Sequence, residues 1–159
     1  MDVSKLLEDA RSDPNLLSKI DIQSLLMDSV KHDFLESHTL DTIAHDVIDS
    51  LKSLSQRRLI GRALLEEYCK KLMGYRYVDE LHLLHKGKYV RWIRLDSPLT
   101  MSVGGVVVDI KFGDEGVNIL CRLSSGRFIQ YRFDRCMTYQ KLSDEEQLIL
   151  LLNGRPDDT

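Results

Sequence analysis

The sequence lacks several features that would assign it to a particular class of protein. No run approaches the roughly 20 apolar residues that span a bilayer, and the first residues lack the basic-then-apolar order of a secretory signal. The glycine-rich nucleotide-binding patterns and the serine-hydrolase elbow are also absent. We therefore expect no membrane insertion, no cofactor, no small-molecule substrate and no enzymatic activity.

Cysteine is scarce as well. Cys69, Cys121 and Cys136 are odd in number, widely spaced and in no CxxC pair. This pattern indicates free thiols and an intracellular, reducing compartment, either cytoplasm or nucleus. His82 and His85 are three positions apart, but only Cys69 is a nearby further ligand, and metal sites usually need three or four. We expect no metal site.

Charge and aromatic residues are unevenly spread along the 159 residues. Residues 86–142 hold ten Lys or Arg against five Asp or Glu, whereas the rest of the chain holds twelve against twenty. Nine of the eleven aromatic residues lie from Tyr75 onward. The second half therefore has the composition of a basic β-structure, and the first half that of an acidic helical one.

Residues 1–74 show helical periodicity. One apolar stripe runs from Leu40 to Leu54 and another from Leu59 to Leu72, at the three- and four-residue spacing of amphipathic helices. Earlier stripes predict further short helices before residue 35. Residues 39–54 and 57–73 are expected to form a helical hairpin.

Residues 88–142 predict five short strands. In residues 104–112 and 117–123 apolar and polar side chains alternate, and Gly113–Gly116 and Ser124–Gly126 are turn signals between runs. A sandwich needs about seven strands. The succession therefore favours a five-stranded SH3-like β-barrel.

The C-terminal part predicts one more helix. Ser143 followed by Glu146 is a capping box, and apolar residues follow it up to Asn153-Gly154. The whole chain is thus predicted to be α+β. Its parts are a helical region (1–74), a linker with a short helical turn (75–87), the barrel (88–142), a C-terminal helix (143–154) and a disordered tail (155–159).

Two binding surfaces are candidates on the predicted barrel. The first is a protein or peptide groove, because large aromatic side chains with polar handles are favoured as interface anchors. Its candidate residues are Tyr89, Trp92, Phe128, Tyr131 and Tyr139. The same rings could instead fill the core.

The alternative is a nucleic-acid surface made of cations beside stacking aromatics. Its candidate residues are Lys88, Arg91, Arg94, Arg122, Arg127, Arg132 and Arg135. These cations could equally pair with the acidic helices of the same chain.

Four segments carry a resemblance to a group of known proteins. They are Tyr75–Leu81, Lys86–Ile93, Gly104–Ile110 and Gln140–Ser143. They resemble small, largely uncharacterised proteins of the large nucleocytoplasmic DNA viruses of amoebae and algae. The resemblance implies a virion or host-cytoplasm setting and a structural role, and it transfers no site residue.

Taken together, these observations predict a non-catalytic interaction or assembly protein. Its expected partner is another protein or a further copy of itself, with nucleic acid as the alternative.

Overall fold

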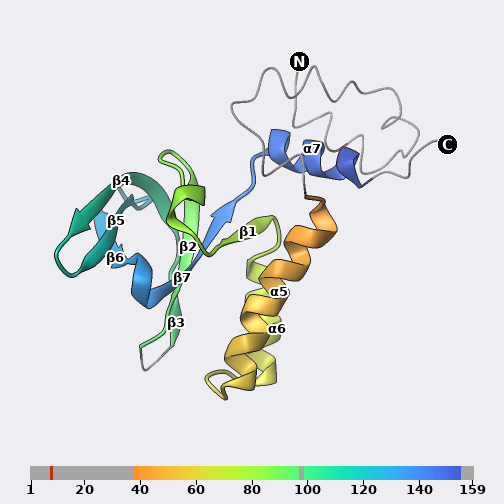
Figure 1. Cartoon of the computed structure of the whole chain (residues 1–159), viewed down its shortest axis with the longest axis horizontal. Helices are drawn as coiled ribbons and strands as arrows, with labels where there is room; N and C mark the ends of the chain where they lie inside the picture. The colour runs from red at the N-terminus through yellow and green to blue at the C-terminus, as the bar shows by residue number, and fades with distance from the viewer. Residues whose placement is uncertain (1–7, 9–37, 97–98, 155–159) are drawn as a thin grey trace. The chain divides into compact units, whose positions relative to one another are not determined.

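The computed structural model describes residues 8, 38–96 and 99–154, and element labels follow Figure 1. The helices predicted before residue 35 and the tail at 155–159 lie outside the described residues. The described part is α+β, as expected, with three α-helices and a seven-stranded antiparallel sheet. The chain divides into two compact units, Asp46–Lys141, and Met1–His45 with Leu142–Thr159.

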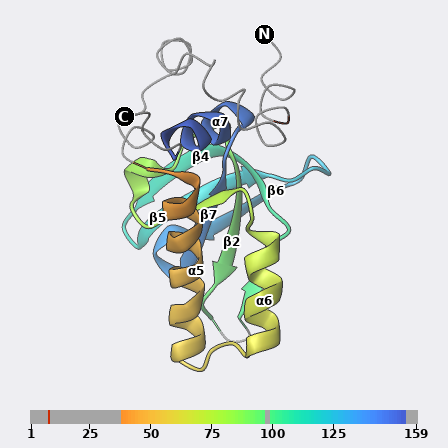
Figure 2. The ribbon, with the colours of Figure 1, turned by 90° about the vertical axis from the view of Figure 1, so that its right-hand side faces the viewer.

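Two of the helices form the predicted hairpin. Helix α5 (Leu40–Gln56) begins where Thr39 Oγ1 accepts a hydrogen bond from Thr42 N at 3.2 Å, and helix α6 (Arg62–Lys71) follows Gly61. Figure 2 shows the two side by side, joined by a short turn. Their apolar stripes meet at Leu51, Leu54 and Tyr68 in one buried cluster.

The sheet occupies most of residues 75–141. Its strands are β1 (Tyr75–Val78), β2 (Tyr89–Arg94), β3 (Thr100–Met101), β4 (Gly105–Gly113), β5 (Gly116–Arg122), β6 (Phe128–Arg132) and β7 (Cys136–Lys141). They lie in the order β1-β7-β2-β4-β5-β6, with β3 paired to β2. Two 3-10 turns, η1 (Leu81–Leu83) and η2 (Phe133–Arg135), precede β2 and β7.

The predicted five-stranded SH3-like barrel is not confirmed, because the sheet has seven strands and does not close. Strand β1 lies in the segment predicted as a linker and pairs with β7, so β7 has β1 on one side and β2 on the other. The sheet thus ends at β1 and at β6, and these two ends are not paired within the described residues.

The two faces of the sheet have different coverings. On one face, Ile93, Met137 and Tyr139 pack against α5 and α6. On the other face, side chains from β2, β4, β5 and β6 pack on one another, as Trp92 does with Tyr131. A register shift between Val107 and Asp109 in β4 adds local twist to this part of the sheet.

A buried hydrogen bond joins the helical hairpin to the sheet. Ser50 Oγ in α5 lies 2.6 Å from Val47 O and 2.8 Å from Tyr139 Oη. Because the serine has one hydroxyl proton and donates it to Val47 O, the tyrosine is the donor in the second bond. Burial raises the pKa of Tyr139, so this donor keeps its proton at neutral pH.

The third helix, α7 (Asp144–Asn153), has the predicted capping box. Glu146 N donates to Ser143 Oγ at 3.1 Å, and Ser143 N donates to Glu146 Oε1 at 3.0 Å. At its other end, Asn153 Nδ2 donates to His38 O at 3.0 Å.

The link between hairpin and sheet is testable by comparing two substitutions. Ser50→Ala leaves the fully buried Tyr139 hydroxyl without an acceptor, so we expect a loss of about 1–3 kcal/mol of unfolding free energy. Tyr139→Phe leaves Ser50 bonded to Val47, and we expect a smaller loss of about 1 kcal/mol. Urea unfolding measures both. In the double variant residue 139 has no hydroxyl left to be unpaired, so the loss of unfolding free energy should be smaller than the sum of the two single losses. A loss equal to that sum would contradict the hydrogen bond between Ser50 and Tyr139.

Candidate functional site

The most distinctive site in the described part of the chain surrounds Trp92. Strand alternation places Val90 and Trp92 on the face of β2 away from the helices. The indole stacks on Tyr131 of β6 with ring centroids 4.3 Å apart and planes at 12°. Tyr131 Oη in turn lies 3.0 Å from Thr138 Oγ1 of β7, so the pair is held from both sides.

Ser102 fixes the segment that forms one wall of the site. Trp92 N donates to Ser102 Oγ at 3.0 Å, and Ser102 N donates to Trp92 O at 2.8 Å. These bonds continue the β2–β3 pairing past Met101. The short strand β3 and the residues after it are thereby held along β2.

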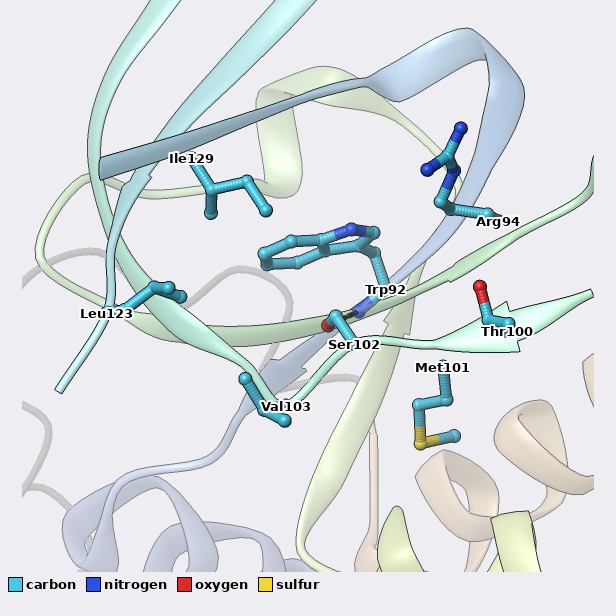
Figure 3. A pocket seen from close by; sticks show the side chains of 8 residues that line it. All are labelled: Trp92, Arg94, Thr100, Met101, Ser102, Val103, Leu123 and Ile129. Atoms are coloured by element: carbon cyan, nitrogen blue, oxygen red, sulfur yellow. Dashed lines mark hydrogen bonds between the residues drawn. The ribbon is translucent and has the colours of Figure 1, made fainter. Parts of the chain in front are cut away.

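A pocket of about 180 Å³ opens over the indole. Figure 3 shows Trp92 at its centre, Leu123 and Ile129 on one side and Ser102 and Val103 on another. Arg94 and Thr100 line the remaining rim, while the side chain of Met101 points away from the ring. An engineered apolar cavity of about 150 Å³ accepts benzene, so this pocket has room for one aliphatic or phenyl side chain.

Apart from Arg94, the residues that line the pocket are apolar or carry a hydroxyl group. Among the described residues, no three His, Cys, Asp or Glu side chains gather as a metal site would require. Burial raises the pKa of Cys121 to about 12 and that of Cys136 to about 11, so both thiols near Tyr131 stay protonated at neutral pH. Protonated thiols are poor nucleophiles.

Strand β6 forms an open edge beside the pocket. Leu123 N donates to Arg127 O at 2.8 Å, and hydrogen-bonded pairs alternate along an antiparallel ladder. Ile129 and Tyr131 therefore bond to β5, whereas the N–H and C=O groups of Phe128 and Gln130 point away from it. As β6 ends the sheet, no described strand receives these groups.

Exposed apolar side chains gather at the same end of the sheet. Val106, Arg122 and Phe128 are cross-strand neighbours on β4, β5 and β6. Phe128 is 63% exposed, Ile129 41% and Val106 37%. Val106 and Phe128 share one face of the sheet, and Ile129 lies on the other, the face of the pocket. We call Val106 and Phe128 the Phe128 patch. Exposed apolar clusters rimmed by polar groups mark interaction sites.

The five predicted groove aromatics do not form one surface. Trp92, Tyr131 and Tyr139 are buried, and Tyr139 lies in the cluster with α5 and α6. Tyr89 is half-buried because its hydroxyl donates to Val103 O at 2.9 Å, and its ring fills the space where Gly104 would have a Cβ. Only Phe128 is largely exposed.

The seven predicted cations also separate into groups. Arg94 pairs with Asp96 at 3.6 Å and Arg132 with Asp134 at 3.1 Å. Arg91 is partly buried, with an Nε that lacks a hydrogen-bond partner. Lys88 is half-buried and Arg135 is exposed.

Arg122 and Arg127 are the two cations next to the Phe128 patch. Both are exposed, and neither forms an ion pair with any other described residue. Arg122 is the cross-strand neighbour of Phe128, and Arg127 directly precedes it.

Sequence reasoning missed most of the pocket wall. Ser102 and Val103 lie in a loop without periodicity, so nothing local indicated that they line Trp92. Ile129 did carry a signal: it alternates with Tyr131 and so shares the face of that strand that meets Trp92.

Comparison of the chain with models of protein families, with curated proteins and with solved structures finds no match to any of them. None of the described helices combines the length and the apolar character needed to cross a membrane.

The buried thiol of Cys121 makes stability fall at alkaline pH. Its folded-state pKa is raised from 9.0 to about 12, so its contribution is complete below pH 9 and is lost as the pH rises toward 12. We expect the unfolding free energy to fall from pH 9 to 10, and to fall less steeply in Cys121→Ala. Urea unfolding at pH 8, 9 and 10 gives both slopes. Since the alanine also leaves a cavity, the slope is the readout, and equal slopes would contradict the assignment.

Proposed function

We propose that this protein is a non-catalytic protein-interaction module, and that it binds its partner through the Phe128 patch and the Trp92 pocket. The observation that carries the proposal is the coincidence of three features at one end of the sheet. An apolar pocket, exposed apolar side chains and an unpaired strand edge all include β6.

Each feature supplies a different part of an interface. The pocket offers a half-open, largely apolar hollow for one apolar anchor, and such anchors contribute most of the energy of many interfaces. Phe128 and Val106 offer further apolar contact area at the same end of the sheet, on its opposite face. The buried stack of Trp92 on Tyr131 holds the floor of the pocket in place, so little ordering is required on binding.

The chain offers a matched pair of substitutions for testing this surface. Phe128→Ser removes the largest side chain of the patch, which is 63% exposed. Phe112→Ser removes a ring that is even more exposed, at 77%, at the far end of the β4–β5 hairpin. We expect chemical cross-linking in cell extract to yield a partner adduct that is lost with the first change and kept with the second. Loss with neither or with both would contradict the assignment.

A single-stranded nucleic acid is the second candidate, favoured by one observation. The exposed ring of Phe128 has Arg122 as its cross-strand neighbour and Arg127 as its neighbour in sequence, and an exposed ring close to cations can stack a base while the cations contact phosphates.

This second function predicts a strong dependence on salt. Binding of an oligothymidine should weaken at least tenfold between 50 and 200 mM salt, roughly what release of a few counterions gives. Arg122→Ala with Arg127→Ala should remove it, whereas Arg94→Ala, whose side chain already pairs with Asp96, should change it little. Fluorescence anisotropy measures the affinity, and absence of binding at 50 mM salt would dismiss this function.

A further inference from the structure

The proposed interaction function leaves open what kind of partner segment β6 receives. We propose that the open edge of β6 binds an extended, acidic peptide of another protein as an added β-strand, with one apolar side chain of that peptide in the Trp92 pocket. This inference rests on the proposed function and specifies its partner.

The backbone of β6 provides the first argument. The N–H and C=O groups of Phe128 and Gln130 point outward at the free edge of the sheet, and Phe128, Ile129 and Gln130 are all exposed. An edge of this kind is a template for strand addition, in which main-chain hydrogen bonds supply affinity and alternate side chains supply specificity.

The position of the pocket provides the second argument. Ile129 lies on the face of β6 that meets Trp92, and it lines the pocket. In a strand added next to β6, the side chain beside Ile129 points to the same face, because paired residues of neighbouring strands share a side. That side chain enters the pocket, which accepts one aliphatic or phenyl group.

Charge provides the third argument and identifies the partner as acidic. Arg127 precedes β6, Arg122 flanks Phe128, and Arg94 stands on the pocket rim. The first two have no carboxylate partner within the described residues. Two carboxylates lie close to these groups, Asp96 and Asp134, and each is already paired with an arginine. Carboxylates on the bound strand would satisfy the remaining cations.

The same charges disfavour a second copy of the chain as the occupant. Strand β6 ends at Arg132 and is directly preceded by Arg127, so its edge has a cation near each end. Like charges on neighbouring strands are destabilising, and cations on an edge strand are a common protection against self-association. An acidic strand of a different protein meets no such repulsion.

The test uses the full chain and synthetic seven-residue peptides in which glutamate alternates with leucine. Trp92 is the single tryptophan of the sequence, so its fluorescence reports occupation of the pocket directly. We expect the glutamate peptide to shift the emission saturably, and the same peptide with lysine for glutamate to bind at least tenfold more weakly. Equal affinities for the glutamate and lysine peptides would overturn the proposal that the partner is acidic.

N-methylated peptides test the strand addition itself. Methylating every second amide on one register removes the N–H groups that face β6, and methylating the other register leaves them intact. We expect the first set to lose at least tenfold in affinity and the second set to bind as the parent peptide does. Equal affinity of the two sets would overturn strand addition.

Two protein variants complete the test. Arg127→Glu should weaken the glutamate peptide and strengthen the lysine peptide. Gln130→Pro removes an outward-facing N–H at an edge-strand position, where proline is tolerated. It should therefore abolish binding while the urea midpoint stays near that of the parent. If the fixed φ of proline unfolds this variant, the N-methylated peptides still test the strand addition.

Other occupants give distinct results. A dimer at micromolar concentration that Gln130→Pro dissociates would assign the edge to a second copy and overturn the proposal. An emission shift with oligothymidine but not with the glutamate peptide would assign it to a nucleic acid, also overturning it. In each case the comparison of Phe128→Ser with Phe112→Ser still decides separately whether the protein is an interaction module.

Discussion

The stacking of Trp92 on Tyr131 is the contact on which the shape of the sheet depends. These residues lie on β2 and β6, which are three strand spacings apart, about 14 Å in a flat sheet. Their ring centroids are 4.3 Å apart, so the sheet must curl strongly. Gly104 and Gly105 allow this curl because they have no Cβ, and Tyr89 and the backbone of Arg122 approach them closely. The pocket and the open edge of β6 both exist because this curl stops short of closure.

One part of the sheet packs against helices, and another part exposes apolar side chains. On the face toward α5 and α6, large side chains are buried and the one polar link, Tyr139 to Ser50, is satisfied. Farther along the sheet, on β4 to β6, no described helix supplies such a cover for Phe128. Apolar area that the fold does not bury itself is area that a partner can bury. The same sheet thus packs on the helical hairpin in one part and offers a contact surface in another.

Local patterns carried much of the fold, and non-local pairing decided the rest. Alternation located β4 and β5, and the Ser143–Glu146 pair correctly predicted the start of α7. Strand β1 was missed although Tyr75 to Val78 alternates in burial, because its partner strand lies 60 or more residues away in the sequence. Closure depends on which strands end the sheet, and no local pattern contains that. The site could not be predicted for the same reason. Trp92 is buried because it stacks on Tyr131, and these residues lie on strands that are not neighbours in the sheet.

The position of β7 between β1 and β2 has a consequence for how the chain acquires its structure. Of the described strands this one is synthesised last, yet it lies between β1 and β2, each of which pairs with it. Until residue 141 has been made, β1 has no neighbour and β2 lacks one. Contacts so distant in sequence form slowly, because the entropy of closing a long loop is lost before the contacts contribute any favourable free energy. The helical hairpin and the β4–β5–β6 meander can form earlier, and insertion of β7 is the event that turns them into one cooperative unit.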